Sequence, residues 1–334
     1  MQSSSQTPFI SVIVPVYNGE RYLGDALQSL SSQTFEDIEV IVVDDGSSDR
    51  SSTIAAQFAE RDRRFHLIAL ATPSGRPARA RNTGIAAAHG TFIAFLDADD
   101  IALPNRFASV VAVLRTSKAR MVFADMLRLD PDAKSPNVTP ILGGRGFPSA
   151  AHDFLNAVAP SLYVCRSTFP AFMISNYEAI HVPTVVCLRE LLADEPFVFD
   201  ERLVCGEDLD LFYRLARRTQ PVFIEDVHSI VRVHPTSLTA SRPAQTAMDA
   251  LAVRTKHYED LRSTLDSVED SLARQRLARA HWELGYARWC KGQNAPARAS
   301  FAASFRLRPS LTATASYLKA WLPRARLRGW TPHV

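Results

Sequence analysis

Short apolar runs alternate with longer amphipathic segments over the first hundred residues of the chain. The apolar runs are rich in β-branched residues and have the length of buried strands. They cover residues 10–14, 38–43, 65–69 and 91–96. We expect Pro15 to end the first of these strands, because proline has no N–H to donate to a neighbouring strand.

The segments between the apolar runs predict helices. Residues 23–30 carry leucine and alanine at the spacing of one helix face. A second helix follows the second strand, with Ile54, Ala55 and Phe58 facing inward, and a third covers residues 79–89. This alternation of strand and helix predicts an α/β fold of βαβ units, with a mostly parallel sheet and helices on both of its faces.

Polar residues follow the predicted strands where each strand ends. These strand ends carry residues 15–18, Asp44–Gly46 and Asp97–Asp99. In an open sheet of parallel strands, ligands bind beyond the carboxyl ends of the strands. We therefore expect these polar and acidic side chains to converge on one edge of the sheet and to form the ligand site there.

The acidic strand ends narrow the chemistry of that ligand site. The chain has no GxxxxGK[ST] motif, which excludes a P-loop, and no GxGxxG follows the first strand. If the ligand carries a diphosphate, the carboxylates at the strand ends repel it, so a divalent cation has to stand between the carboxylates and the diphosphate. Mg²⁺ and Mn²⁺ both accept carboxylate oxygens as ligands. The spacing of Asp97 and Asp99 suits such a cation, although aspartate pairs also end strands without binding a metal.

Composition and charge place the chain among globular proteins. Its 334 residues allow two or three domains at about 100–200 residues each. There is no run of 18 apolar residues, so we expect no transmembrane helix, and no apolar signal core near the start, so secretion is not expected. The four cysteines lie far apart, and we expect them to be free thiols in a reducing cytoplasm. Residues 242–334 carry a net charge of +9 and residues 1–241 a net charge of −6, which suggests two functional surfaces.

Five motifs stand in a fixed order along residues 8 to 240. They are Val12–Asn18, Val42–Asp49, Ala80–Gly84, Phe95–Asp100 and Gly206–Asp208. This ordered set resembles that of the family 2 glycosyltransferases. The resemblance implies the GT-A fold, a nucleotide-activated sugar as donor and inversion at the anomeric carbon.

The resemblance also implies a role for several residues of the first two motifs. Pro15, Tyr17 and Glu20 would line the nucleotide pocket, with Tyr17 against the base. Asp44 or Asp45 would accept a hydrogen bond from an N–H of the base, as an ionised carboxylate can.

The diphosphate and metal positions come from the third and fourth motifs. By the resemblance, Arg76 or Arg81 would face the diphosphate or the edge of the base, and Arg79 competes with both for this role. A solvated helix face is the alternative for each arginine. Asp97 would lie near the ribose, and Asp99 would bind the metal.

An inverting transfer needs one further carboxylate, on the acceptor side, to take the proton of the incoming hydroxyl. Glu207 and Asp208 stand at the start of a predicted helix, where acidic residues also act as simple caps. The resemblance makes Asp208 the general base and lets Glu207 orient the acceptor. Asp210 would face solvent or pair with Arg214 at i, i+4.

A late histidine, His234, has two interpretations. The resemblance places it near the metal or diphosphate, and a neutral imidazole is a suitable ligand for manganese. Alternatively, it fixes the loop before Pro235. His181 and His228 have weaker claims and are expected to form loop hydrogen bonds. Residues 125–200 would shape the acceptor pocket.

Residues 242–334 read as helical throughout. Two helices, at about 272–291 and 294–307, resemble a single degenerate tetratricopeptide repeat. One repeat cannot bury its own core, so it must pack on the catalytic part, on a helix near 311–323 or on a partner. The last segment, 311–330, is amphipathic and basic, and it would either contact an anionic membrane or dock on the repeat with a solvated basic end. Nucleic acid is a poor alternative, because the site is acidic.

Together these observations predict a metal-dependent inverting glycosyltransferase with Mn²⁺ or Mg²⁺ as cofactor. Residues 1–240 would form the GT-A catalytic domain and 241–334 the helical region. The enzyme would move a sugar from a nucleotide-diphosphate sugar, preferably a UDP-sugar, to a hydroxyl of a glycan or lipid-linked saccharide in cell-surface polysaccharide synthesis. It would be cytoplasmic, with a peripheral contact at the inner face of the membrane. The alternatives are a sugar nucleotidyltransferase, or a decayed transferase that acts as an interaction module through its helical tail.

Overall fold

The computed structural model describes residues 7–130, 139–193 and 198–321. By its internal contacts the chain divides into two compact units. The first comprises residues 1–170 and 178–240, and the second comprises residues 171–177 and 241–334.

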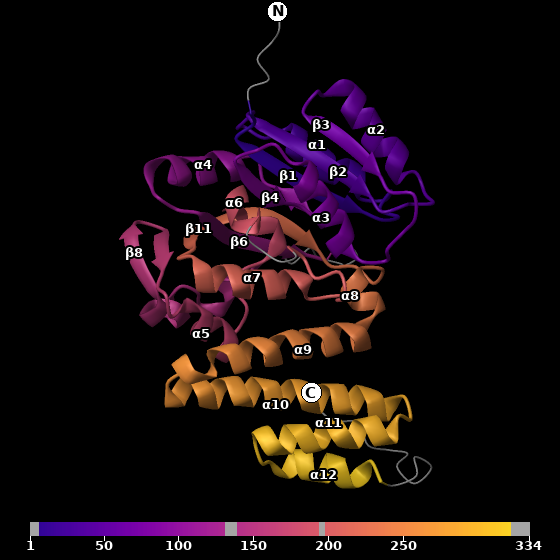
Figure 1. The fold of residues 1–334 in the computed structure, drawn as a ribbon, viewed down its shortest axis with the longest axis vertical. Coiled ribbons are helices and arrows are strands. Elements are labelled where there is room, and N and C mark those ends of the chain that lie inside the picture. Colours follow the sequence, from indigo (N-terminus) through magenta and orange to yellow (C-terminus); the bar gives the residue numbers. More distant parts are fainter. Residues whose placement is uncertain (1–6, 131–138, 194–197, 322–334) are drawn as a thin grey trace, which may run out of the picture. The chain divides into compact units, whose positions relative to one another are not determined.

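The first unit is built on one mixed sheet (Figure 1). Its strand order is β3-β2-β1-β4-β10-β6-β11-β9-β8. Its first four strands run parallel, as the alternation of strand and helix predicts. They are β1 (Ile10–Val16), β2 (Ile38–Asp44), β3 (Phe65–Ala69) and β4 (Phe92–Phe95). The predicted α/β class is confirmed, with an all-helical region after it.

The second half of the sheet mixes both strand directions. Strand β10 runs antiparallel to both β4 and β6, and β6 pairs in parallel with β11. Two short strands lie off the main order, where β5 pairs with β11 and β7 pairs with β6. The bounds are β5 (Ile101–Ala102), β6 (Met121–Leu129), β7 (Thr139–Pro140), β8 (Leu155–Ala159), β9 (Leu162–Cys165), β10 (Val186–Leu188) and β11 (Val222–Arg232).

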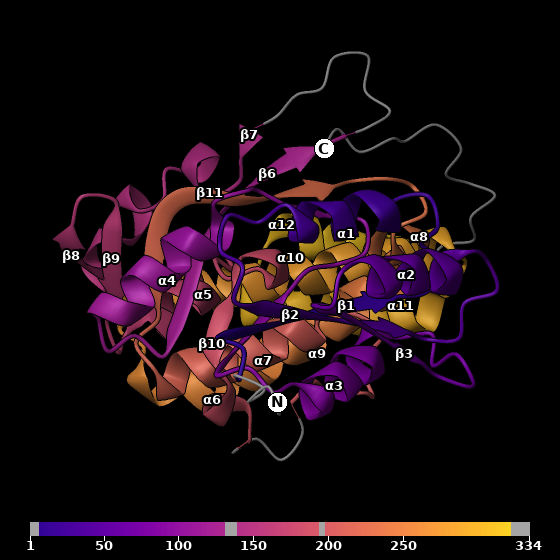
Figure 2. The same ribbon diagram turned by 90° about the horizontal axis from the view of Figure 1, so that it is seen from above.

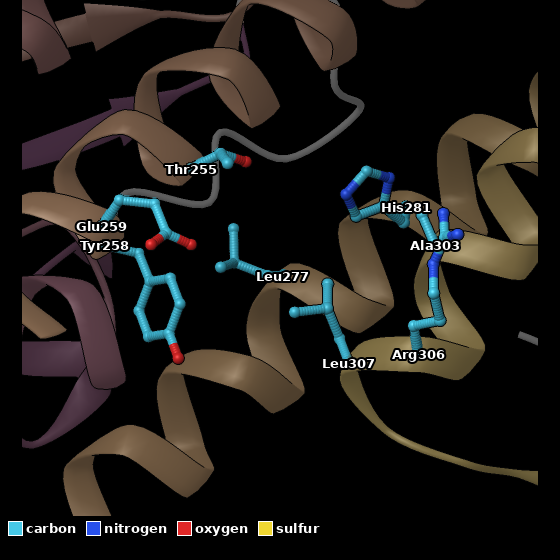
Figure 3. A pocket seen from close by; sticks show the side chains of 8 residues that line it. All are labelled: Thr255, Tyr258, Glu259, Leu277, His281, Ala303, Arg306 and Leu307. Carbon is cyan, nitrogen blue, oxygen red and sulfur yellow. The ribbon is translucent and has the colours of Figure 1, made fainter.

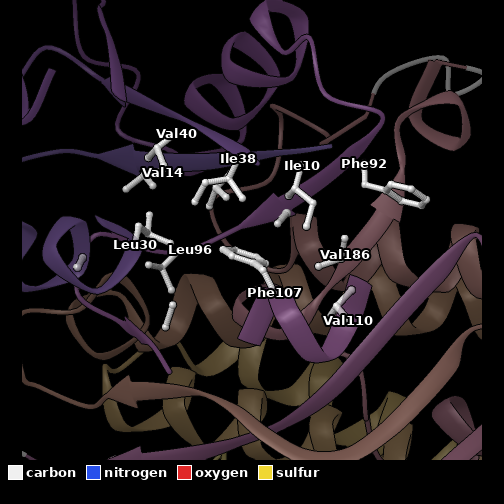
Figure 4. Packing of buried hydrophobic residues seen from close by; sticks show 14 of the residues in the cluster. Ile10, Val14, Leu30, Ile38, Val40, Phe92, Leu96, Phe107, Val110 and Val186 are labelled. Atoms are coloured by element: carbon white, nitrogen blue, oxygen red, sulfur yellow. The ribbon is translucent and has the colours of Figure 1, made fainter. Parts of the chain in front are cut away.

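Helices cover both faces of the parallel strands (Figure 2). Alternate residues of β1 and β2 pack against apolar residues of α1, α2 and α4, and together they form the main core of the unit (Figure 4). Helix α3 packs on the opposite face, where a β-carbon at Gly84 would lie only 2.5 Å from Cγ2 of Ile13. The bounds are α1 (Leu23–Ser31), α2 (Ser51–Arg61), α3 (Pro77–Ala87) and α4 (Arg106–Thr116).

The expected end of the first strand is wrong by two residues. Strand β1 continues through Pro15 to Val16, where Pro15 pairs with Val43 of β2. On the other side of β1, the pairing with β4 already stops at Ile13. Pro15 is tolerated because no β4 partner requires an N–H at this position. The third helix also begins at Pro77, two residues earlier than expected, because proline is well suited to the first turn of a helix.

The remaining helices up to residue 241 are short, apart from α7, and two of them, α5 and α8, include residues of both units. They are α5 (Phe169–Ser175), α6 (Arg189–Ala193), α7 (Glu207–Arg218) and α8 (Leu238–Ser241), with 3-10 turns at Gly143–Arg145, Ser149–Phe154 and Val182–Thr184. Helix α7 bears the predicted acidic pair in its first turn.

The second unit is helical, as predicted. Its elements are α9 (Pro243–Leu261), a 3-10 turn (Arg262–Thr264), α10 (Ser267–Cys290), α11 (Asn294–Leu307) and α12 (Leu311–Lys319). The helix pair α10–α11 packs on the following segment, where Ala297 and Phe301 form a small core with Ala320. Of the three expected partners of the repeat-like pair, contact with the helix near residue 311 is observed. Residues 322–330 of the predicted basic segment lie outside the described residues.

A cavity of about 230 Å³ lies within this helical unit, between α9, α10 and α11 (Figure 3). It is lined by Thr255, Tyr258, Glu259, Leu277, His281, Ala303, Arg306 and Leu307. None of the predicted site residues belongs to it. In the part of the chain that the structure describes, no helix has both the length and the apolar character needed to cross a lipid bilayer.

Candidate active site

The register of the parallel strands brings the predicted site residues to one edge of the sheet. In the β1–β2 pair, Val16 lies opposite Asp44, so the loops after both strands begin side by side. Strand β4 ends at Phe95 next to Ile13 of β1, and residues 97–100 follow it on the same edge. The topology therefore places the loops after β1, β2 and β4 together.

His234 reaches the same edge through a pairing that the sequence does not reveal. Strand β5 follows residues 97–100 directly and pairs antiparallel with β11, with Ala102 opposite Ser229. Because antiparallel strands run in opposite directions, residues before β5 lie beside residues after β11. As a result, His234 Nε2 lies 2.9 Å from Asp99 Oδ2. Its Nδ1 lies 2.8 Å from Thr236 Oγ1, which orients the ring.

Arg232 fastens the end of β11 to this loop. Its backbone N–H donates to Asp100 Oδ1 (3.1 Å), and its guanidinium donates to the carbonyl oxygen of Asp99 (3.2 Å). A third contact goes to Asp25 of α1 at 2.8 Å. The centroid of the Tyr22 ring lies 5.1 Å from the guanidinium carbon of Arg232 and 4.9 Å from the centroid of the His234 ring. Arg232 was not among the site residues predicted from the sequence. Its position two residues before His234 was the one feature of the sequence that pointed to it.

Three carboxylates crowd into this loop. Burial and the charge of Asp97 raise the pKa of Asp99, although His234 acts in the opposite direction. Burial, followed by the charges of Asp99 and Asp97, raises the pKa of Asp100 well above its ordinary value. Each negative charge therefore disfavours the ionisation of the neighbouring carboxyl groups, and a cation at this position would relieve the repulsion.

The residues present fit a divalent cation only with help from a ligand. Asp99 and His234 offer one carboxylate oxygen and one imidazole nitrogen at the same point, a donor set that suits manganese. Within the described ranges, no group of three or more His, Cys, Asp or Glu side chains is arranged to hold a metal. Mg²⁺ and Mn²⁺ commonly complete their coordination with substrate phosphates and water, so two protein ligands are consistent with such a site.

On the side of the site formed by β1 and β2, the two carboxylate oxygens of Asp45 have different surroundings. Its Oδ2 accepts hydrogen bonds from the N–H and hydroxyl of Ser74 (2.8 and 2.7 Å) and from the N–H of Gly75 (3.2 Å). Its buried Oδ1 has no hydrogen-bond partner among the described residues. A buried acceptor without a donor is costly, so this oxygen is open to a donor from a ligand. Asp44 instead accepts from the N–H of Ser47 (2.9 Å) and closes its own loop.

The other residues predicted for the nucleotide pocket differ in their availability. Tyr17 follows β1 directly and is 50% exposed, so its ring is open to a ligand. Pro15 is buried within β1. Glu20 accepts from the backbone N–H of Arg50 (3.0 Å) and supports the start of α2. Arg76 donates to the carbonyl oxygen of Glu201.

The predicted base lies in the first turn of α7. This helix starts after Gly206, whose φ of 81° favours glycine, and its first two residues are Glu207 and Asp208. Asp208 is half-buried, and its Oδ1 accepts from the N–H of Leu209 (2.8 Å). Asp210 is buried and pairs with Arg214 (2.9 Å), one of its two expected arrangements.

Arg81 joins this turn to the loop after β4. One arm of its guanidinium forms an ion pair with Glu207, and the other donates to Asp97 Oδ1 at 2.6 Å. Burial alone would lower the pKa of Arg81, but the charges of Asp97, Glu207 and Asp208 outweigh it and raise that pKa. Burial also raises the pKa of Glu207 to about 7, against the attraction of Arg81. The single positive charge of Arg81 thus interacts favourably with three carboxylates.

Comparison with known proteins identifies the family. The sequence model described as Glycosyl transferase family 2 matches residues 11–136. Over 250 residues the chain is 32% identical to the uncharacterized glycosyltransferase EpsJ of Bacillus subtilis, covering 72% of this chain and 66% of EpsJ. The chain belongs to glycosyltransferase family 2.

Solved structures show that this family 2 chain has the GT-A fold. The S. aureus TarS 1–349 structure in complex with UDP-GlcNAc matches with a TM-score of 0.65 and 19% identity, over 94% of this chain and 89% of TarS 1–349. The mannosyltransferase PcManGT from Pyrobaculum calidifontis, in complex with GDP-Man and Mn²⁺, matches with a TM-score of 0.54 and 19% identity, over 95% and 80% of the two chains.

Proposed function

We propose that this chain is a metal-dependent inverting glycosyltransferase, which transfers a sugar from a nucleoside-diphosphate sugar to a hydroxyl group. The observation that carries the proposal is the arrangement of two separate acidic centres, which Arg81 links through Asp97 and Glu207. Asp99 with His234 forms the first centre, and Asp208 forms the second. Glycosyl transfer needs both a centre for the leaving diphosphate and a base for the incoming alcohol.

A UDP-sugar is the favoured donor. Uracil has one imide N–H, and the buried Asp45 Oδ1 lacks a donor among the described residues. The exposed ring of Tyr17 offers a surface on which the base can stack. The related fold of TarS, which was solved with UDP and with UDP-GlcNAc, supports this assignment.

The metal in the proposal is Mn²⁺ or Mg²⁺, held by Asp99 and His234. When bound, it supplies positive charge that neutralises the leaving diphosphate. The complex of PcManGT with Mn²⁺ supports the choice of ion. Thr236 fixes the His234 ring through Nδ1, which leaves Nε2 directed at Asp99.

In the transfer step, the acceptor oxygen forms a bond to the anomeric carbon while the bond from that carbon to the diphosphate oxygen breaks. The hydroxyl proton passes to the Asp208 carboxylate. Asp208 suits this role because it is half-buried and only one hydrogen bond to its carboxylate is observed in the described chain, from the N–H of Leu209. Glu207 precedes it and would orient the acceptor side.

The acceptor would be a glycan or lipid-linked saccharide, which fits a peripheral contact with an anionic membrane. Near the end of the described residues, three large apolar side chains are exposed, at Leu311 (90%), Leu318 (59%) and Trp321 (60%). Lys319 lies among them, and the chain has no acidic residue after Glu283. Apolar side chains beside cations favour anionic lipid surfaces. Co-sedimentation with phosphatidylglycerol vesicles but not with phosphatidylcholine vesicles would support this contact, and equal recovery with both would contradict it.

The decisive experiment is the replacement of Asp208 by Asn. We expect sugar transfer to fall by at least about 10²-fold, the lower range for loss of a general base. The affinity for UDP with Mn²⁺ should stay unchanged, because Asp208 lies on the acceptor side. Asp226→Asn, at an exposed carboxylate in β11, is the matched control and should transfer at the wild-type rate. Transfer by Asp208→Asn at a near wild-type rate would refute the assignment.

A further inference from the structure

The geometry points to Arg81 as a positioning residue that fixes the turn bearing the base relative to the carboxylates of the donor side. This inference rests on the proposed function, because it presumes that Asp208 is the base. The resemblance of the motifs implies that Arg81 binds the diphosphate or the edge of the base. The positioning role proposed here is a different one.

Both arms of the Arg81 guanidinium are already engaged. One arm pairs with Glu207 and the other with Asp97, and the Arg81 side chain is only 5% exposed. The two carboxylates come from different elements, the first turn of α7 and the loop after β4. A planar guanidinium spans two such partners in a fixed geometry, whereas an ammonium group is a point charge with rotatable donors and does not fix their relative position. A diphosphate bound to Arg81 would compete with these two carboxylates for the same positive charge.

The neighbours of Arg81 on α3 hold the same segment. Asn82 exchanges two hydrogen bonds with the backbone of Phe199, both at 2.9 Å. The ring of Phe199 in turn lies 5.3 Å from the Arg81 guanidinium carbon. Arg76 donates to the carbonyl oxygen of Glu201. Helix α3 is therefore the anchor for the segment that leads into the base-bearing turn.

This anchor is itself fixed to the sheet. Helix α3 approaches β1 and β2 so closely that a β-carbon at Gly84 would lie 2.5 Å from the Ile13 side chain and 3.2 Å from that of Val43. A rigid path therefore leads from the sheet through α3 and Arg81 to Glu207, the residue next to Asp208. A displacement of the base by about 1 Å can cost about 10²-fold in rate, so such support is catalytically important.

The inference is tested with Arg81→Lys, which keeps the positive charge but lacks the planar fork that fixes the two carboxylates relative to each other. We expect kcat to fall about tenfold or more, with the KM for the donor and the Kd for UDP with Mn²⁺ within about threefold of the wild type. Arg64→Lys is the matched control, since Arg64 also pairs with a carboxylate, Asp62, at 2.7 Å. It should leave kcat unchanged.

A double-mutant cycle with Glu207→Ala separates positioning from other roles. If Arg81 acts through Glu207, the double variant should be no slower than the slower single variant. Additive losses would overturn the inference, as would a Kd for UDP that rises by the same factor as kcat/KM falls, which would make Arg81 a donor-binding residue. Where Arg81→Lys does not fold, Glu207→Ala is measured alone: a lower kcat with an unchanged KM for the acceptor supports positioning, and a raised KM for the acceptor overturns it.

Failure of the proposed function is recognised separately. A wild-type enzyme that binds UDP-sugars but neither transfers nor hydrolyses them would overturn both proposals. An active wild type with an unimpaired Arg81→Lys variant would overturn the positioning role alone.

Discussion

Replacement of Asp45 by Asn tests how the site reads the base of the donor. Three donors, the N–H and hydroxyl of Ser74 and the N–H of Gly75, point at Oδ2 of Asp45. In the variant, the amide oxygen has to occupy this position, because an NH₂ group would face three donors there. The NH₂ group is then forced into the position of Oδ1, where the wild type has a buried acceptor without a partner among the described residues. The substitution thus turns an acceptor into a donor at one point.

The expected effect follows from the lost hydrogen bond. A hydrogen bond to a charged group contributes about 1.5–3 kcal/mol, which corresponds to a rise of about 10- to 150-fold in the Kd for UDP. Cytosine presents an acceptor nitrogen where uracil presents its N–H, so CDP should lose less affinity or gain some. The ratio of the two Kd values should therefore shift towards CDP, by the full factor where the affinity for CDP is unchanged.

Isothermal titration calorimetry with UDP and CDP, each with Mn²⁺, measures this ratio directly. Asp62→Asn is the control, since Asp62 binds Arg64 in another part of the unit and should leave both Kd values unchanged. Thermal unfolding of Asp45→Asn checks that the loop from Ser74 to Gly75 is retained. If the variant unfolds like the wild type and still binds UDP within about twofold of it, Asp45 does not read the base.

Two further predictions concern the metal centre and the packing of α3. Asp99→Asn should abolish the part of the UDP affinity that depends on Mn²⁺, because it removes one of the two proposed protein ligands; an equal gain from Mn²⁺ in both proteins, measured by calorimetry, would contradict this. Gly84→Ala should lower the free energy of unfolding, since overpacking against Ile13 and Val43 costs about 1–3 kcal/mol and outweighs the helix-propensity gain of about 1 kcal/mol. Gly24→Ala in α1, where a β-carbon meets nothing within 4 Å, is its control in urea unfolding and should not destabilise; a Gly84→Ala protein as stable as the wild type would refute the packing argument.

Several features of the fold could be predicted because their causes are local. The strand from Phe65 to Ala69 has the predicted bounds, and β2 differs from its prediction by one residue. β-Branched runs between turn residues specify such strands whatever surrounds them. The convergence of the strand ends follows equally from the parallel arrangement. The continuation of β1 through Pro15 could not be predicted, because it depends on which neighbouring strand ends first.

The site shows the same division between local and long-range causes. The sequence by itself determined which carboxylates end the strands and that Glu207 and Asp208 begin a helix, because turn and cap preferences act within a few residues. Only the tertiary structure decided that His234 meets Asp99 across 135 positions and that Arg81 meets Glu207 across 126. The first contact depends on the pairing of β5 with β11, and the second on the close approach of α3 to the sheet. Strand register and packing of this kind are set by the whole core, so no local pattern records them.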